Sequence, residues 1–531
     1  MLRHSIWYWF IVYLGLFELA SAACPSVCIC DRDSNNRKRV RCDQGGLSIP
    51  AAFALQSIDK DVEVLLIAAP AGKPNSVSGL EPNMFKDLQL KELYLTNSQL
   101  ESIGHRTFYY LSSTLQVLNL ANNNIMDINE NNFRNLSVLT HLHLDHNKIS
   151  HLHSAVFNYQ RSLKVLTVSN NRITDLGTRF LLQELPVLEV LDISGNPIGG
   201  KKIDPHIESI PELIFQDVPN LRKVSLANTN IEKIPFSAVA KYCRNLEDLD
   251  VSNNKITTIS DKQFNLIKSL RRLNLAGNQL TSIIPGSFSG LKLDHLDLSN
   301  INSNLFRENS TRALFQNSEV KSLSLASNGL QEVDQQLLTP IATDLIAIDL
   351  GGNPINLRDR MFQFLPNLQS LSLSSMRLPR LPSKLLDYNH KVIALNISSN
   401  LFAAIDEKVF QSAPKLEVLD FSNNKIQAVP YLVSQLPLRE LHANDNLLKN
   451  LPDHLLDSFQ ADGSPIKTVR IHGNPLQCDY MVAALSNWVS STAGRKIVCG
   501  EDAGYRCPVC AAPSGVEGTP VDEIKVLVSK A

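Results

Sequence analysis

After its first 22 residues, the chain of 531 residues contains no apolar run long enough to cross a lipid bilayer. It also has no excess of either charge, because 51 basic and 52 acidic side chains leave a formal net charge of −1. We therefore expect no membrane span, and no general electrostatic attraction toward nucleic acid or an anionic membrane surface.

Signatures of common active sites are missing as well. The sequence has no His-Glu-x-x-His segment and no glycine-rich loop followed by Lys-Ser or Lys-Thr. Phe288 stands between Gly286 and Gly290, where a Gly-x-Ser-x-Gly motif needs serine. The sequence therefore favours a protein that is not an enzyme and that uses no cofactor.

Cysteine is nearly absent from the middle of the chain. Between Cys42 and Cys478 only Cys243 occurs, shortly before the repeat leucine Leu246. We expect Cys243 to be a buried free thiol, and a bridge to a second chain is the alternative.

What fills the middle is one recurring pattern, Leu-x-x-Leu-x-Leu-x-x-Asn followed by x-Ile-x-x-Ile. A clear copy contains Leu115, Leu118, Leu120 and Asn123. The copies follow one another at intervals of about 25 residues, which is the period of leucine-rich repeats. The asparagine position of each copy, named the asparagine slot below, is occupied by Ser98, Asn123, Asn147, Asn171, Asn196, Thr229, Asn254, Asn278, Ile301, Asn328, Asn353, Met376, Asn400, Asn424, Asn446 and Asn474.

The order of residue types in the repeat follows from strand geometry. Leucines two positions apart point to the same side of a short strand, so each coil has an apolar face that only a neighbouring coil can cover. Stacked coils place their strands in a parallel sheet, and the asparagine amide can satisfy backbone groups where the chain leaves that sheet. Because Ile301 and Met376 cannot do so, we expect local irregularity there.

A second buried row is predicted ten residues after the slot. Several copies carry phenylalanine at this offset, and stacked core is a far commoner use of such a row than a ligand pocket. The residues are Phe108, Phe133, Phe157, Phe264, Phe288 and Phe410.

Both ends of the chain have features of a secreted protein. Residues 1–22 combine Arg3, an apolar stretch and Ala20-Ser21-Ala22, as a signal peptide does. In the oxidising compartment that this implies, clustered cysteines are expected to form disulfides, and Cys507-Pro-Val-Cys510 is better explained in this way than as a redox or zinc pair. The clusters are Cys24, Cys28, Cys30 and Cys42 at one end, and Cys478, Cys499, Cys507 and Cys510 at the other.

These cysteine clusters and repeats together resemble the extracellular leucine-rich-repeat family with cysteine caps, which includes Slit, Toll-type ectodomains and the small matrix proteoglycans. The resemblance implies an α/β solenoid, curved as a horseshoe, with a parallel β-sheet on its concave face. It also implies disulfides between Cys24 and Cys30 and between Cys28 and Cys42. At the other end the family-like pair is Cys478 with Cys499, although Tyr480 replaces a usual cysteine and leaves Cys507 and Cys510 without an assigned partner.

The expected organisation is a single elongated domain behind the signal peptide. Residues 23–57 form the N-terminal cap, residues 58–474 hold about 16–17 repeats, residues 475–510 form the C-terminal cap, and residues 511–531 are a polar tail. Residues 199–219 lengthen one repeat and are expected to bulge, either as a binding loop or as a neutral one. The basic run from Arg37 to Arg41 is expected to be a solvated loop rather than an anion site.

Candidate binding residues occupy the outward strand positions, where charges of both signs alternate. The alternation fits either mutual neutralisation between coils or a protein-recognition surface, and the sequence leaves both open. His141 and His143 alternate with Asp145 and could hold zinc, but no further ligand is near, so we expect no metal. The candidates are His141, His143, Asp192, Lys223, Asp248, Asp250, Arg271, Arg272, Asp297 and Asp420.

Three Asn-x-Ser/Thr sequons, at Asn135, Asn309 and Asn396, are predicted glycosylation sites. By its resemblance the chain is expected to be a secreted protein that binds an extracellular receptor or matrix component in matrix organisation, adhesion or guidance. Alternatives are innate-immune recognition or receptor modulation, and a self-assembling structural glycoprotein that forms a homodimer. No nucleic-acid partner is expected.

Overall fold

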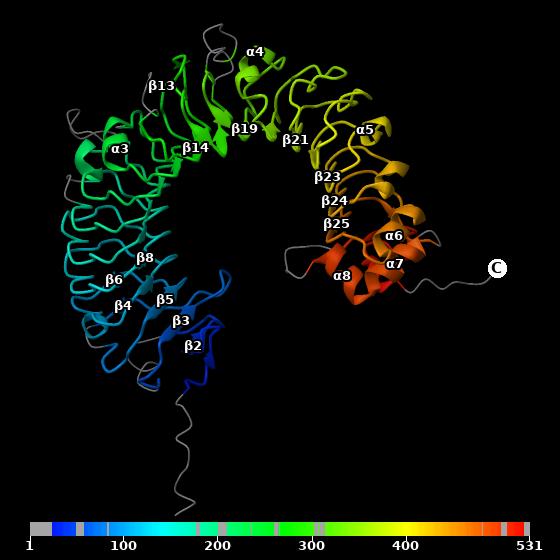
Figure 1. Cartoon of the computed structure of the whole chain (residues 1–531). Helices are drawn as coiled ribbons and strands as arrows, with labels where there is room; N and C mark the ends of the chain where they lie inside the picture. Colours follow the sequence, from blue (N-terminus) through cyan, green and yellow to red (C-terminus); the bar gives the residue numbers. More distant parts are fainter. Residues whose placement is uncertain are drawn as a thin grey trace, which may run out of the picture. The chain divides into compact units, whose positions relative to one another are not determined.

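The structure is a computed structural model (Figure 1), and it describes most of the chain. The predicted signal peptide and the sequon at Asn309 lie outside the described residues. The described residues are 24–48, 58–81, 84–176, 181–199, 210–234, 236–259, 264, 266–301, 306, 314–479, 482–500 and 507–524.

The backbone divides into two compact units, Met1–Lys255 and Ile256–Ala531. In a solenoid each coil contacts only its neighbours, so no common core joins distant coils. Each unit is a parallel β-solenoid in which a strand of each coil pairs with the strand of the next coil.

In the first unit the sheet begins with the only antiparallel strand pair found among the described residues of its ladder, β1 with β2. From β2 onward each strand pairs in parallel with the strand of the following coil. The strands are β1 (Ile29–Arg32), β2 (Lys38–Cys42), β3 (Val64–Ala68), β5 (Glu92–Thr96), β7 (Val117–Asn119), β8 (His141–His143), β9 (Val165–Thr167), β10 (Val190–Asp192), β11 (Lys223–Ser225) and β12 (Asp248–Asp250).

The second unit continues the pattern with a parallel ladder of its own. Its strands are β14 (Arg272–Asn274), β17 (His295–Asp297), β19 (Ser322–Ser324), β20 (Ala347–Asp349), β21 (Ser370–Ser372), β22 (Ala394–Asn396), β23 (Val418–Asp420), β24 (Glu440–His442) and β25 (Thr468–Arg470). Short two-residue pairings join some coils elsewhere, namely β4 (Gly79–Leu80) with β6 (Ser102–Ile103), β13 (Thr258–Ile259) with β15 (Ser282–Ile283), and β16 (Lys292–Leu293) with β18 (Glu319–Val320).

Short helices occupy the returning sides of several coils. In the first unit they are η1 (Tyr109–Leu111), η2 (Glu212–Phe215) and α3 (Phe236–Tyr242). In the second unit they are α4 (Gln335–Leu338), η5 (Thr339–Ile341), α5 (Lys408–Gln411), η6 (Tyr431–Gln435), α6 (Asp453–Gln460), α7 (Ala483–Ser490), α8 (Thr492–Cys499) and η8 (Val521–Glu523).

The repeat leucines and phenylalanines form the core, as predicted. Leu118 is buried at the centre of β7, while Val117 and Asn119 on either side of it are half-exposed. The predicted phenylalanine row is buried throughout. Stacked rings link successive coils, with centroid separations of 6.4 Å from Phe108 to Phe133 and 5.8 Å from Phe264 to Phe288.

The asparagine slot works as a bridge to the preceding coil. Asn123 donates from Nδ2 to the carbonyl of Leu95 at 2.7 Å, and its Oδ1 accepts the backbone N–H groups of Ser98 and Leu100 at 3.0 and 3.1 Å. The same ladder recurs at the other described slots that hold asparagine, for example at Asn424. Buried polar backbone at the edge of each strand is therefore satisfied by the next coil.

Coils that lack asparagine in the slot show the expected irregularity in their backbone. After Met376, Arg377 adopts a φ of 58°, and Gln99 and Asn230 behave alike after Ser98 and Thr229. In each of these coils, the N–H of the slot residue itself donates to the asparagine of the next coil. Serine and threonine replace only part of the asparagine's bonding: Thr229 Oγ1 donates to the Leu226 carbonyl at 2.7 Å and Ser98 Oγ to the Thr96 carbonyl at 2.9 Å, but the ordinary turn is not restored.

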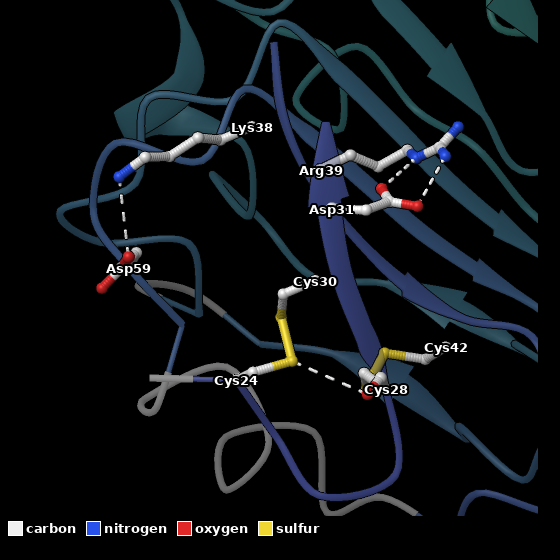
Figure 2. The surroundings of a disulfide bond; sticks show 8 residues. All are labelled: Cys24, Cys28, Cys30, Asp31, Lys38, Arg39, Cys42 and Asp59. Carbon is white, nitrogen blue, oxygen red and sulfur yellow. Dashed lines mark hydrogen bonds and ion pairs between the residues drawn. A yellow bond between two sulfur atoms is a disulfide. The ribbon is translucent and has the colours of Figure 1, made fainter. Parts of the chain in front are cut away.

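The N-terminal cap has the disulfides that the resemblance implied, Cys24–Cys30 and Cys28–Cys42 (Figure 2). Cys28–Cys42 ties the start of β1 to the end of β2, and Cys24–Cys30 ties the segment before β1 to that strand, at the first edge of the sheet. The exposed strand edge that an open array would have is thereby covered.

The basic run belongs to this cap, and the predicted solvated loop is wrong. Lys38 to Arg41 lie in β2, and each cation of the run has an acidic neighbour. Arg39 forms a two-pronged bond with Asp31 at 2.8 Å, shown in Figure 2, and its hydrogen bond lowers the pKa of that carboxyl. Because the charges are matched locally, the run is not a free anion site.

The C-terminal cap differs from the prediction in its pairing. The disulfides are Cys478–Cys510 and Cys499–Cys507, so the expected Cys478–Cys499 bridge is wrong. The cause is a strand pairing between β26 (Leu476–Gln477) and β27 (Cys510–Ala512), in which the Cys478 N–H donates to the Ala512 carbonyl at 2.7 Å.

Part of the predicted polar tail also belongs to this cap. Val521 is buried, Asp522 forms an ion pair with Arg495, and Ser486 in α7 donates to the Ile524 carbonyl at 3.0 Å. The cap therefore extends to residue 524 rather than ending at residue 510, because an apolar residue anchors an otherwise charged segment.

Candidate functional site: the outward faces of the two sheets

The strongest candidate binding surface lies on the outward face of the second unit's sheet. A groove of about 460 Å³ runs across β17 to β24. Its central floor consists of small side chains, because the outward positions of neighbouring strands are serine or alanine. These residues are Ser322, Ser324, Ala347, Ser370, Ser372 and Ala394.

Polar side chains mark the ends and one side of this groove. His295 lies at one end, where its Nδ1 is 3.1 Å from Ser322 Oγ, and His442 lies at the other, with Nε2 3.4 Å from Glu440 Oε2. Asp349 and Asp420 line the same groove. Small residues between charged ones leave room for a partner's side chains and supply polar groups to orient them.

Several predicted charges on the faces have a structural task that the sequence did not reveal. Asp297 Oδ1 accepts the N–H of Ser299 at 2.9 Å, and Asp420 Oδ1 accepts that of Ser422 at 2.9 Å. Asp192 and Asp250 do the same in the first unit, and Asn396 occupies the equivalent position. These acids terminate their strands by capping the backbone two residues on, which leaves one oxygen of each carboxylate for other use.

Other charges, some predicted and some not, neutralise one another between neighbouring coils. Lys223 lies 3.8 Å from Asp248, and Lys321 lies 2.7 Å from Asp294, whose pKa it lowers through a hydrogen bond. Exposed pairs of this kind stabilise a fold by no more than about 1 kcal/mol. Arg271 donates to the Lys292 carbonyl at 3.1 Å, and Arg272 is exposed on β14 in register with His295 of β17; neither arginine lines the groove.

His141 and His143 lie on β8, with ring centroids 6.3 Å apart. His143 Nδ1 is 2.9 Å from Thr167 Oγ1, which also donates to Asp145, and burial lowers the pKa of His143 below its usual value. The carboxylate of Asp145 is engaged in addition by the N–H of Ser169. No group of three or more metal-ligating side chains occurs among the described residues.

Two further hollows of the second unit were not anticipated. One of about 940 Å³ is lined by Arg358, Arg380, Leu381 and neighbouring residues of three coils, and one of about 900 Å³ adjoins it at Arg358. They arise from the loops that follow the slots, and no sequence motif marks them. Cys243 is a buried free thiol, as predicted, and its burial raises the thiol pKa to about 12.

The family profile described as leucine rich repeat matches residues 88–149, 137–198, 244–303 and 391–455 of this chain, and a two-copy repeat profile matches residues 219–263. The chain belongs to the leucine-rich-repeat family. The matched residues include β5 to β12, β14 and β17, and β22 to β24, so strands of both units belong to matched leucine-rich repeats, and the chain has disulfides near both ends.

Known leucine-rich-repeat relatives are similar over much of the chain. An adenylate cyclase of Schizosaccharomyces pombe is 24% identical over 449 residues, which cover 73% of this chain and 25% of the cyclase. Mouse podocan is 27% identical over 367 residues, covering 66% of this chain and 55% of podocan. The chain thus spans less than two thirds of the length of either relative, and the match, which covers a quarter of the cyclase, carries no statement about cyclase chemistry.

Among solved structures, the Toll–Spätzle complex of Drosophila aligns with a TM-score of 0.51 and 17% sequence identity, over 94% of this chain and 75% of that chain. This likeness shows the leucine-rich-repeat fold. Within the described part of the chain, no helix is both long and apolar enough to span a membrane.

Proposed function

We propose that this leucine-rich-repeat protein is secreted and binds an extracellular protein, in matrix organisation, adhesion or guidance. The observation that carries the proposal is the groove on the second unit's sheet. The floor of the groove is made of small side chains. Beside it, exposed charges on the same coils already form ion pairs, as Lys321 does with Asp294 and Arg439 with Glu417. A surface with unfilled space and few satisfied charges is what a protein partner can cover.

The groove favours a partner segment that presents basic side chains. Asp349 and Asp420 each use Oδ1 to accept a backbone N–H, at 2.9 Å in both cases. Both residues line the groove, so the second oxygen of each carboxylate is available to a cation or N–H donor of the partner. The similarity to podocan agrees with the resemblance to small matrix proteoglycans on which the matrix role rests.

Proximity labelling with the secreted chain on living cells tests the proposal. Ser372→Arg places a long cation in the groove, and we expect it to abolish labelling of the partner that the unaltered chain marks. Gln411→Arg is the matched control, because Gln411 is exposed on α5 of the same unit and outside the groove. Equal labelling by all three proteins would refute the groove as the binding surface.

The two other roles inferred from the sequence make different predictions in the same experiment. A self-assembling glycoprotein would label mainly copies of itself and would scatter light as a dimer. An immune recognition protein would label a microbial or receptor ligand, and its expression would rise on infection. Labelling of matrix or adhesion proteins by a monomer supports the proposed role.

A further inference from the structure

Exposed tyrosines bracket the sequon at Asn135 in the first unit. Tyr110, Asn135 and Tyr159 belong to three successive coils, and each stands twelve residues after its asparagine slot, at Ser98, Asn123 and Asn147 respectively. Equivalent positions of successive coils are stacked neighbours in a solenoid. Asn135 therefore lies between two tyrosine positions, one on each adjoining coil.

Contacts between the three coils support this arrangement. The rings of Phe108 and Phe133, two residues before Tyr110 and Asn135, stack at 6.4 Å. Gln160, which follows Tyr159, donates from its buried Nε2 to the carbonyl of Phe133 at 2.6 Å. The guanidinium of Arg134 lies 5.5 Å from the centroid of the Tyr159 ring.

The sequon itself is presented outward on a fixed backbone. Asn135 and Ser137 are exposed, whereas Leu136 between them is buried and anchors the segment. Asn135 has a φ of 74°, and the Ser137 N–H donates to its carbonyl at 2.7 Å. By contrast, Asn396 is half-exposed and its Oδ1 already accepts the Ser398 N–H.

The two tyrosines differ in what already covers them. Tyr159 is 39% exposed and one side of its ring is occupied by Arg134, a residue of the same coil as Asn135. Tyr110 is also 39% exposed, and its ring contacts that of Tyr109 of its own coil at an edge-on angle of 86°. Among the described residues, a side chain of the Asn135 coil covers Tyr159, but none is found on the ring of Tyr110, so Tyr110 is the ring that a group attached to Asn135 could still cover.

We propose that Asn135 carries an N-linked glycan whose first N-acetylglucosamine packs against the ring of Tyr110. On attachment, the side-chain nitrogen of Asn135 bonds to the anomeric carbon, loses one proton, and displaces the pyrophosphate of a lipid-linked oligosaccharide donor. The C–H face of the sugar then covers an aromatic surface that would otherwise remain in water. This site is independent of the groove on the second unit, and it requires only that the chain enters the secretory route.

The test uses the full chain with its own leader, secreted from cells in which glycans are kept in the high-mannose form. Asn309→Gln and Asn396→Gln leave Asn135 as the single sequon, and the mass of its peptide reports occupancy. Endoglycosidase H leaves one N-acetylglucosamine on Asn135, whereas peptide-N-glycosidase F removes the glycan entirely. We expect the first treatment to preserve the melting temperature and the second to lower it by roughly 1–3 °C.

Substitutions then identify the ring. Tyr110→Ala and Tyr110→Leu should abolish the difference between the two enzyme treatments, and the leucine variant keeps apolar bulk without an aromatic face. Tyr159→Ala is the matched control and should retain the difference. Asn135→Asp should melt with the fully deglycosylated protein, because that enzyme also leaves aspartate.

Three outcomes would overturn the proposal. An unmodified Asn135 peptide from the secreted protein would remove the glycan itself. Equal melting after both enzymes would remove the contact with the first sugar. A difference that persists in both Tyr110 variants, or that disappears in Tyr159→Ala alone, would remove the assignment to Tyr110.

Discussion

Asn400 accepts the backbone N–H of Met376, 3.1 Å away on the preceding coil. The same Oδ1 accepts the N–H of Leu378 at 3.0 Å, and Nδ2 donates to the Leu373 carbonyl at 2.9 Å. One side chain thus satisfies three backbone groups of a coil that has no asparagine in its own slot. This coil depends on its neighbour more than most coils do.

The first prediction concerns that dependence. Asn400→Ala should lower the free energy of unfolding by about 3 kcal/mol or more, because each buried backbone group left without a partner costs about 1–3 kcal/mol. Urea unfolding followed by circular dichroism measures the change. Asn367→Ala is the control. Asn367 is half-exposed, donates to the Thr343 carbonyl and accepts from Lys391 Nζ, and because water can replace both partners the substitution should cost about 1 kcal/mol or less.

The second prediction concerns the C-terminal cap. Non-reducing digestion should release peptides that join Cys478 to Cys510 and Cys499 to Cys507. Replacing the first pair by serines should destabilise the cap by about 4 kcal/mol and the second by about 2.5 kcal/mol, because their loops close over 32 and 8 residues. A peptide joining Cys478 to Cys499 would contradict the pairing.

The third prediction concerns the response of His143 to pH. Burial lowers the pKa of its imidazole below 6.5 in the folded chain, so the unfolded chain binds a proton first as the pH falls. The stability contributed by the neutral imidazole is therefore present above pH 6.5 and declines as the pH falls from 6.5 toward the folded pKa. His143→Gln should flatten this part of the profile, measured by urea unfolding between pH 7.5 and 5. An unchanged slope would show that other groups cause it.

The fourth prediction concerns the thiol of Cys243. With a pKa raised from 9.0 to about 12 by burial, its thiolate fraction near neutral pH is about a thousandfold lower than that of an exposed thiol. A thiol reagent should therefore label the native protein very slowly and the urea-unfolded protein at once. Non-reducing electrophoresis should show a monomer, and a dimer that reductant dissolves would contradict the buried free thiol.

Much of the fold could be predicted because the sequence pattern of each repeat indicates where its strand, its buried face and its turn lie. Leu118 and Phe108 are buried where the pattern placed them, and Asn123 bonds as a turn asparagine should. The pairing of Cys478 with Cys510 could not be predicted, because it depends on strands of two and three residues that no periodicity marks. The same holds for Val521, a single apolar anchor within a charged segment.

The candidate site was less predictable than the fold. The sequence correctly predicted that Asp297 and Asp420 occupy outward strand positions, where they were candidates for binding. It did not reveal that each carboxylate also accepts a backbone N–H at the end of its own strand. The groove forms because small side chains such as those of Ser372 and Ala394 lie next to one another on neighbouring strands. The sequence does not show that such residues are neighbours until the strands have been aligned. The ion pair of Lys321 with Asp294 likewise needs the register between coils.

The direction of the asparagine bonds has a consequence for synthesis. Asn123 serves Leu95, Ser98 and Leu100, all on the coil made before it. Backbone N–H and C=O groups of a newly synthesised coil thus stay unpaired until the next coil has left the ribosome. During translation, each coil therefore completes its hydrogen bonds only after the following coil has been made. A chain truncated at its C-terminal side would leave its last complete coil without the asparagine bonds of a following coil. A chain truncated at its N-terminal side would leave every remaining coil with the following coil that bonds it.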